Sequence, residues 1–120
     1  MTPGEPDCIF CKIVRGEILC NKVHEDEHVL AFHDIHPLAP VHILVIPKIH
    51  LASLAECDDT HRDVLGRMLA VAGRLARQAG SAEGFRTIIN TGRVGGQEVY
   101  HLHAHILGGP KRLPRMLSRD

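Results

Sequence analysis

The sequence has few aromatic residues and no long hydrophobic run. Phe, Tyr and Trp together make up 3% of the 120 residues, with one Tyr and no Trp. Proteins that bind single-stranded nucleic acid stack its bases on aromatic side chains, so this composition argues against such a partner. A membrane span needs roughly 18 to 20 apolar residues, and the first residues lack the basic and apolar regions of a signal peptide. We therefore expect a cytoplasmic protein with no membrane partner.

An excess of either charge is also lacking. Fourteen Lys and Arg balance fourteen Asp and Glu, so the formal net charge at neutral pH is zero. Proteins that bind nucleic acid polymers neutralise many phosphates with clustered Lys and Arg. The sequence therefore predicts no DNA or RNA partner. Its length and its 44% hydrophobic content are typical of one compact domain.

Histidine, by contrast, is abundant, with ten in the chain. Imidazole transfers protons, attacks electrophiles and binds metal ions near neutral pH, so the chain is rich in groups for site chemistry. Four Cys lie at positions 8, 11, 20 and 57. In a cytosolic protein we expect such thiols to be reduced, buried or bound to metal.

The hydrophobic pattern predicts an α+β fold. Apolar residues recur at helical spacing over residues 60–79, which predicts one long helix, and residues 8–15 favour a short N-terminal helix. Short extended segments joined by turns indicate an antiparallel sheet packed against the long helix. These segments are expected at residues 22–24, 29–33, 42–46, 85–90 and 100–107.

The last extended segment carries histidines at every second position, namely His101, His103 and His105. Because successive side chains of a strand point to opposite faces, the three imidazoles line one face at intervals of roughly 6.5 to 7 Å. Three imidazoles with an open coordination position can also bind zinc, and an exposed polar face of an edge strand is a further interpretation. The strand alone leaves these interpretations open.

The segment NTGRVGGQEVYHLHAHILGG at residues 90–109 resembles the histidine triad (HIT) family, and more closely its nucleotide-binding, HinT-like branch. Further matches are DCIFCKI at 7–13, AFHDI at 31–35, APVH at 39–42 and IPK at 46–48. The resemblance implies a HIT domain over residues 7–109, and we expect a disordered N-terminus at 1–6 and a tail at 110–120. It also implies a HIT-like fold with a five-stranded antiparallel sheet, a homodimer, and hydrolysis of purine nucleoside phosphoramidates or adenylates through a covalent nucleotidyl-histidine.

The resemblance further implies which residues form the active site. His103 matches the nucleophile of the family, and His105 and His42 match residues that hydrogen-bond the phosphoryl oxygens. Asp34 matches the acceptor of the ribose hydroxyls, and a turn or helix-capping role is the alternative. The other matching positions are Phe10, Ile13, Phe32 and Ile35 around the base, and Asn90, Gly96, Gln97 and Glu98 around the phosphate and the leaving group. The four apolar residues would suit a hydrophobic core equally well.

Two of the cysteines, in a C-x-x-C spacing, suggest a metal site. Together with His24 and His28 they have the spacing of a DNA-binding zinc finger, but three acidic residues separate those histidines and apolar residues are missing where a finger needs them. Some members of the family instead bind a structural Zn²⁺ with two Cys and two His in a closed tetrahedral set. The matching positions here are Cys8, Cys11, His50 and His101. Two unmetallated thiols are the alternative, and no organic cofactor is expected.

One nucleophile and one phosphate site serve both P–N and P–O leaving groups. The residues alone do not separate the two, and the resemblance favours a nucleoside phosphoramidase acting on an AMP-like purine nucleotide. A hydrolase or transferase of dinucleoside polyphosphates or other nucleotidyl anhydrides is the second candidate, and a non-enzymatic nucleotide-binding module is the third. The tail after Gly109 lacks the aromatic ending of the better-known eukaryotic members.

Overall fold

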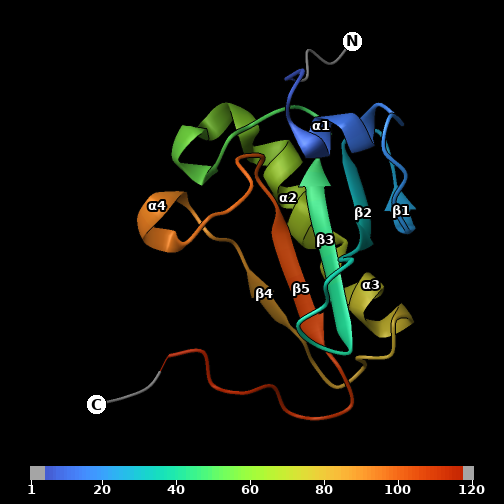
Figure 1. The fold of residues 1–120 in the computed structure, drawn as a ribbon. Coiled ribbons are helices and arrows are strands. Elements are labelled where there is room, and N and C mark those ends of the chain that lie inside the picture. The colour runs from blue at the N-terminus through green and yellow to red at the C-terminus, as the bar shows by residue number, and fades with distance from the viewer. Residues whose placement is uncertain (1–4, 118–120) are drawn as a thin grey trace.

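The computed structural model describes residues 5–117, so the N-terminal prediction for residues 1–4 and the last three residues of the predicted tail lie outside it. Within this part of the chain, five strands form one antiparallel sheet in the order β1-β2-β3-β5-β4 (Figure 1). The strands are β1 (Lys22–Glu25), β2 (Val29–His33), β3 (Val41–Pro47), β4 (Arg86–Ile88) and β5 (Ala104–Gly108). The predicted α+β fold with a five-stranded antiparallel sheet is confirmed.

The predicted long helix over residues 60–79 is divided in the structure. Its two parts meet at Val71, whose backbone N–H is shared between the carbonyls of Arg67 and Leu69. The backbone of Val71 stays helical, with φ −82° and ψ −14°, so the buried face continues across the interruption. None of the described helices is long and apolar enough to cross a membrane. The helices are α1 (Ile9–Val14), η1 (Leu54–Glu56), η2 (Asp59–His61), α2 (Arg62–Ala70), α3 (Ala72–Gln78) and α4 (Gly92–Gly95).

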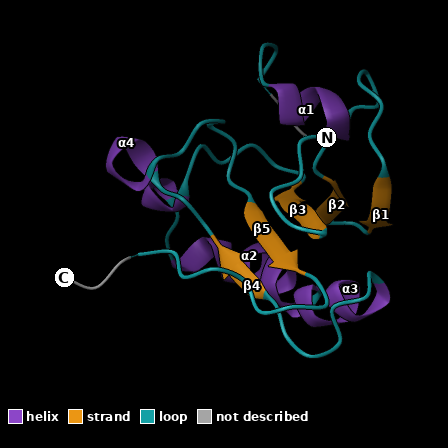
Figure 2. Cartoon of the chain, turned by 60° about the horizontal axis from the view of Figure 1, so that its bottom comes forward, coloured by secondary structure: helices purple, strands orange, loops and turns teal. Residues whose placement is uncertain are grey.

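The two faces of the sheet support separate layers. Figure 2 shows α2 and α3 on one side of the sheet and α1 on the other. Met68 and Leu75 of the α2 and α3 layer pack in a cluster with Val45 and other residues of the sheet. On the opposite face, Phe10 of α1 packs in a second cluster with Phe32 and its neighbours. Strand β3 lies between both layers and is buried along its whole length, as the continuous apolar run predicted.

The histidine-bearing segment enters the sheet later than predicted, because β5 begins at Ala104 and His101 and His103 precede it. Its alternation nevertheless extends back to residue 102. Leu102, Ala104 and Ile106 are fully buried in the cluster under α2 and α3. The histidines therefore lie on the α1 face, where the ring of Phe10 contacts His103 edge-on at a centroid distance of 5.2 Å.

A close backbone approach fixes the far end of β5. The Ser81 hydroxyl donates to the Gly84 carbonyl at 2.6 Å and accepts the Gly109 N–H at 3.0 Å. A Cβ atom on Gly108 would lie 2.1 Å from the Ser81 oxygen, so only glycine allows this contact. The two glycines after the histidine motif thus dock β5 against the loop that follows α3.

Candidate functional site

A cavity of about 650 Å³ opens on the α1 face of the sheet. Most of its lining is apolar, and its polar groups include His42, His103 and His105. Every residue predicted to bind substrate or to act in catalysis lines this cavity, except Gln97. The fold therefore gathers residues between positions 9 and 105 into one concave site, the usual form of a small-molecule site.

His103 is held in one tautomer. Its Nδ1 lies 2.7 Å from the carbonyl oxygen of His101, so this nitrogen carries the proton and donates it to the carbonyl. The other nitrogen, Nε2, therefore bears a lone pair. Every buried side-chain nitrogen or oxygen among the described residues has a hydrogen-bond partner. Nε2 of His103 has no such partner, so it is not buried, and it is open to the cavity that His103 lines. This is the geometry that a histidine nucleophile needs.

A chain of hydrogen bonds also fixes the tautomers of His42 and His105. The backbone N–H of Leu38 donates to Nδ1 of His42 at 3.1 Å, so the proton of a neutral His42 is on Nε2. That nitrogen lies 2.9 Å from Nδ1 of His105 and donates to it. The proton of His105 is therefore on its own Nε2. This N–H has no partner within the described protein and is open to the cavity by the same argument.

Burial keeps these two imidazoles neutral. Burial lowers the pKa of His42, and burial together with the neighbouring His103 and His42 lowers the pKa of His105 to about 4; the Asp34 carboxylate opposes both shifts without reversing them. Of these three histidines, His103 thus presents an open lone pair, beside the open N–H of His105. The centroids of these two rings are 4.9 Å apart. The pair can attack phosphorus and donate to its anionic oxygen.

His42 has a different position from the one expected. It was expected to hydrogen-bond a phosphoryl oxygen, but its ring is 3% exposed and both ring nitrogens are engaged, by Leu38 and by His105. Direct contact with phosphate is therefore not available to it in this geometry. It can act on the phosphate through His105, by holding the tautomer of that residue.

Asp34 has the turn role that was the alternative for it, and it also lines the cavity. Its Oδ1 accepts the backbone N–H of His36 at 2.8 Å, which is the turn role. Its Oδ2 lies 3.5 Å from Nε2 of His42 and faces the site. Each carboxylate oxygen has two lone pairs, so acceptor capacity remains for a ligand.

Asp34, His42 and His105 also bring their ligand atoms within 4.8 Å of one another, close enough to consider a metal ion. The hydrogen bonds of these residues argue against a metal ion. The Leu38 N–H points at Nδ1 of His42, which requires the proton to be on Nε2, and a protonated nitrogen cannot be a ligand. The geometry favours a hydrogen-bonded chain over a metal site at these residues.

Gln97 does not reach the cavity. Its Nε2 donates to the carbonyls of Ala52 at 2.7 Å and Val99 at 2.9 Å, and its Oε1 accepts the N–H of Gly92 at 2.9 Å. The predicted contact of its side chain with phosphate is therefore not supported. Gln97 instead fixes the loop around α4, where Gly96 lines the cavity with a left-handed φ of +79° that favours glycine.

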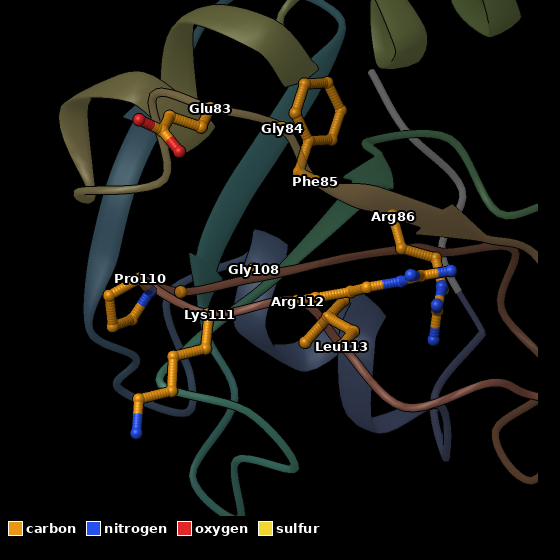
Figure 3. A pocket seen from close by; sticks show the side chains of 10 residues that line it. Glu83, Gly84, Phe85, Arg86, Gly108, Pro110, Lys111, Arg112 and Leu113 are labelled. Atoms are coloured by element: carbon orange, nitrogen blue, oxygen red, sulfur yellow. The ribbon is translucent and has the colours of Figure 1, made fainter.

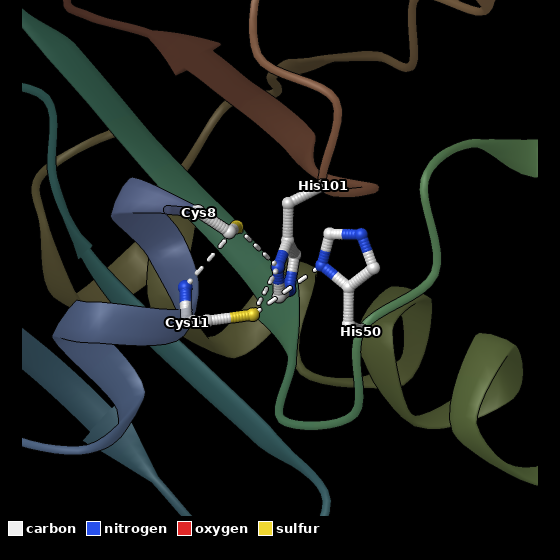
Figure 4. Close-up of side chains that lie close together, drawn as sticks. All are labelled: Cys8, Cys11, His50 and His101. Carbon is white, nitrogen blue, oxygen red and sulfur yellow. Dashed lines mark hydrogen bonds between the residues drawn. The ribbon is translucent and has the colours of Figure 1, made fainter. Parts of the chain in front are cut away.

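Cys8, Cys11, His50 and His101 form a second cluster, shown in Figure 4. Their four ligand atoms lie within 4.8 Å of one another. Sγ of Cys8 is 3.3 Å from Nδ1 of His101, and Sγ of Cys11 is 3.3 Å from Nδ1 of His50 and 3.5 Å from Nδ1 of His101. A sulfur and a nitrogen on one tetrahedral zinc ion are about 3.5 Å apart, so the spacing suits that ion.

The tautomer of His101 agrees with a metal site. Its Nε2 lies 2.9 Å from the carbonyl oxygen of Pro47 and donates to it, so the lone pair is on Nδ1 and faces the two sulfurs. A carbonyl partner of this kind commonly orients a metal-binding histidine. Burial raises the pKa of the Cys11 thiol, so ionising it requires a nearby cation. The donor set therefore fits a closed Zn²⁺ site.

A separate cavity of about 350 Å³ contains none of the predicted site residues. It lies between residues 83–86 and 108–113, and Figure 3 shows Arg86 and Arg112 extending toward the same side of it. Nη1 of Arg86 donates to the carbonyl of Pro114 at 2.8 Å. The described part of the tail is thereby held near β4.

The apolar residues at the main cavity that were not predicted from sequence include three in loops. Ile18, Leu19 and Leu38 line it, although Leu19 is 94% exposed and Leu38 is 83% exposed. Leu38 stands in a short loop between two prolines, and Leu19 follows the end of α1, where neither has an evident place in the core. Large apolar residues in such loops are the signal that could have identified them.

The chain is similar to several known proteins. A family model described as HIT domain matches residues 15–112. The purine nucleoside phosphoramidase of Escherichia coli (strain K12) is 51% identical over 104 residues, which cover 86% of this chain and 87% of that protein. The adenylylsulfatase HINT1 of Arabidopsis thaliana is 50% identical over 110 residues, which cover 90% of this chain and 75% of that protein.

Two further proteins are similar to the chain over most of its length. A 14 kDa zinc-binding protein of Zea mays is 50% identical over 103 residues, which cover 84% of this chain and 80% of that protein. A crystal structure of a histidine triad protein from Clostridium difficile superimposes with a TM-score of 0.89 at 50% identity, and the match covers 95% of this chain and 99% of that chain.

Proposed function

The chain belongs to the HIT domain family, and on this premise we propose that it hydrolyses purine nucleoside 5′-phosphoramidates and related adenylates through a nucleotidyl intermediate on His103. The observation that carries the proposal is the open lone pair on Nε2 of His103 next to the open N–H of His105. Relatives named purine nucleoside phosphoramidase and adenylylsulfatase support the reaction class. No organic cofactor is needed for it.

The nucleoside occupies the apolar part of the cavity in this proposal. Phe10 and Phe32, with ring centroids 5.7 Å apart, border the space for the base together with Ile13 and Ile35. Oδ2 of Asp34 accepts from the ribose hydroxyls. The phosphorus then lies at the histidines, and Asn90 and Gly96 lie on the side of the leaving group.

The reaction has two displacements at phosphorus. In the first, Nε2 of His103 attacks, the Nε2–P bond forms and the P–N bond of the substrate breaks, so that the amine nitrogen keeps the electron pair and takes up a proton from solvent as it leaves. The imidazole becomes cationic, and the carbonyl of His101 stabilises it through the retained Nδ1–H. The N–H of His105 donates to a phosphoryl oxygen throughout. In the second, water attacks and loses a proton to solvent, the Nε2–P bond breaks with its electron pair returning to Nε2, and AMP is released.

Turnover of two substrate classes tests the proposal. Adenosine 5′-phosphoramidate and diadenosine tetraphosphate are compared at equal concentration on one enzyme preparation. We expect the larger kcat/KM for the phosphoramidate, because a polyphosphate brings several negative charges to a site with no formal positive charge. Faster turnover of the tetraphosphate would assign the protein to anhydride hydrolysis, and no turnover of either would leave a nucleotide-binding module.

The cysteine and histidine cluster is proposed to hold one structural Zn²⁺ through Cys8, Cys11, His50 and His101. Four protein ligands close the coordination sphere, so the ion supplies a crosslink and no activated water. This crosslink joins α1 to the loop after β3 and to the segment before β5. The described cysteines are free thiols, a state that a reducing compartment such as the cytoplasm maintains.

A homodimer is also part of the proposal, on the basis of the family resemblance. Sedimentation equilibrium at micromolar concentration should give about twice the chain mass of 13.2 kDa. A single species at the monomer mass would contradict the homodimer and leave the monomer as the active form.

Replacing His42 with alanine should lower kcat on the order of 10²-fold, the usual cost of losing one oriented donor to the transition state. The variant removes the N–H that sets the tautomer of His105, so Nε2 of His105 no longer reliably donates to the phosphate. Steady-state kinetics with adenosine 5′-phosphoramidate measures the change. His61→Ala, which alters a histidine outside the cavity, is the matched control, and equal kcat in both variants would exclude the hydrogen-bonded chain.

A further inference from the structure

The charges around the main cavity are one-sided. Its lining in the described part of the chain contains two carboxylates, Asp34 and Glu98, and neither Lys nor Arg. The two histidines whose protonation is fixed by burial, His42 and His105, are neutral. The phosphate site therefore relies on oriented N–H groups, and its formal charge is negative.

The two carboxylates lie on different sides of the histidines. Asp34 lies beside the start of β3, where its backbone N–H donates to the carbonyl of His42. Glu98 follows Gln97, whose side chain is hydrogen-bonded to the carbonyl of Ala52 in the loop beyond the other end of β3. Under the proposed function, on which this inference rests, Asp34 and the apolar slot hold the nucleoside. The leaving group therefore extends toward Glu98.

Glu98 is free to meet a ligand. It is exposed, it lines the cavity, and it forms no hydrogen bond or ion pair with any other described residue. Its neighbour Gln97 is fully engaged with the backbone, and Gln97 thereby fixes the loop from which Glu98 projects. The carboxylate thus has a defined location without an internal partner.

We propose that Glu98 selects phosphoramidates whose leaving amine carries a second, positively charged group. The carboxylate takes no part in bond making or breaking, and it attracts the distant cation while the P–N bond is cleaved at His103. It also repels an anionic substituent, since like charges placed together are strongly unfavourable. Because the pair is partly solvated, we expect a moderate preference of roughly 5- to 10-fold over a neutral amine.

Three matched substrates test the proposal with the full-length enzyme. They are the adenosine 5′-phosphoramidates of 1,4-diaminobutane, n-pentylamine and 5-aminopentanoate, which have the same four-carbon spacer ending in an ammonium, a methyl or a carboxylate group. In the wild type, kcat/KM should fall in that order. The ratio of the cationic to the anionic substrate should shrink as salt is raised, because ions screen exposed charges.

Two variants identify the residue responsible. In Glu98→Gln the ratio of the cationic to the anionic substrate should collapse to within about 2-fold, because the amide keeps the shape and removes the charge. In Glu83→Gln, which alters a carboxylate at the separate cavity, the ratio should equal that of the wild type. Any difference in the intrinsic reactivity of the amines is common to all three enzymes, so the comparison isolates the carboxylate.

The possible outcomes separate this inference from the proposed function. Turnover of all three substrates without a charge preference, or a preference that persists in Glu98→Gln, overturns the selection by Glu98 and leaves the phosphoramidase assignment standing. A preference for the carboxylate substrate overturns it as well, and it points to basic residues of the tail as the selecting groups. No turnover of any of the three substrates overturns the phosphoramidase assignment and this inference together.

Discussion

Replacing His103 with alanine should reduce the turnover of adenosine 5′-phosphoramidate by roughly 10⁴-fold or more, which is the scale seen when a covalent nucleophile is removed. The reason is geometric. The Nδ1–H of His103 donates to the carbonyl of His101 at 2.7 Å, so the lone pair is on Nε2, and His42 and His105 have no such open lone pair. A water molecule could use the remaining donors, but it would have to attack phosphorus without a covalent intermediate.

Binding and adduct measurements make this prediction specific. AMP should still bind to His103→Ala with an affinity near that of the wild type, because the apolar slot and Asp34 are unchanged, and calorimetry measures this. Wild-type enzyme quenched with acid-free denaturant during turnover should carry an adenylyl group on His103 in peptide mass spectra. His28→Ala, which alters a partly exposed histidine outside the cavity, serves as the control for activity. An adduct on another residue would refute the assignment.

Replacing Cys8 with serine should lower the melting temperature by more than about 10 °C, because losing a ligand of a structural zinc removes several kcal/mol of folding free energy. Cys8 contacts Nδ1 of His101 and also caps α1, where its sulfur accepts the N–H of Cys11. A serine oxygen can still cap the helix, so the change reports mainly on the metal. Turnover measured well below the melting temperature should change only a few-fold.

Metal analysis accompanies this prediction. Purified wild-type protein should contain about one zinc per chain, since the site has four protein ligands, and Cys8→Ser should contain much less. Cys57→Ser is the matched control, because Cys57 is also a partly buried thiol but lies outside the cysteine and histidine cluster that would hold the zinc. Equal melting temperatures for the two variants, or a wild type without metal and with a disulfide between Cys8 and Cys11, would contradict the zinc site. Loss of activity on chelation with the fold intact would make the metal catalytic.

The sequence predicted the parts of the fold that depend on alternation. Leu102, Ala104 and Ile106 lie on one face and the histidines on the other because strand geometry dictates it, even where the backbone has not yet paired in the sheet. The interruption at Val71 depends on how two carbonyls share one N–H, and no side-chain pattern signals that. Helical periodicity continues through it, so a single helix was the natural prediction.

The same distinction applies to the site. The resemblance identified the residues that the fold brings to the cavity, but the functions of His42 and Gln97 are set by backbone groups of other residues, one of them distant in the sequence. The N–H of Leu38 fixes the tautomer of His42, and the carbonyl of Ala52 turns Gln97 away from the cavity. Side-chain identity does not tell where such groups will lie, so these two assignments required the three-dimensional structure.

His101 connects the cysteine and histidine cluster to the cavity histidines through three separate atoms. Its Nδ1 faces the sulfurs of the two cysteines, its Nε2 donates a hydrogen bond to the carbonyl of Pro47, and its own carbonyl orients His103. Without a bound metal, the hydrogen bond to the carbonyl of Pro47 still holds the imidazole of His101, and the main-chain carbonyl of His101 still accepts the Nδ1–H of His103. We therefore expect that replacing both cysteines leaves the orientation of His103 intact, provided that position 101 keeps a side chain able to donate to the carbonyl of residue 47.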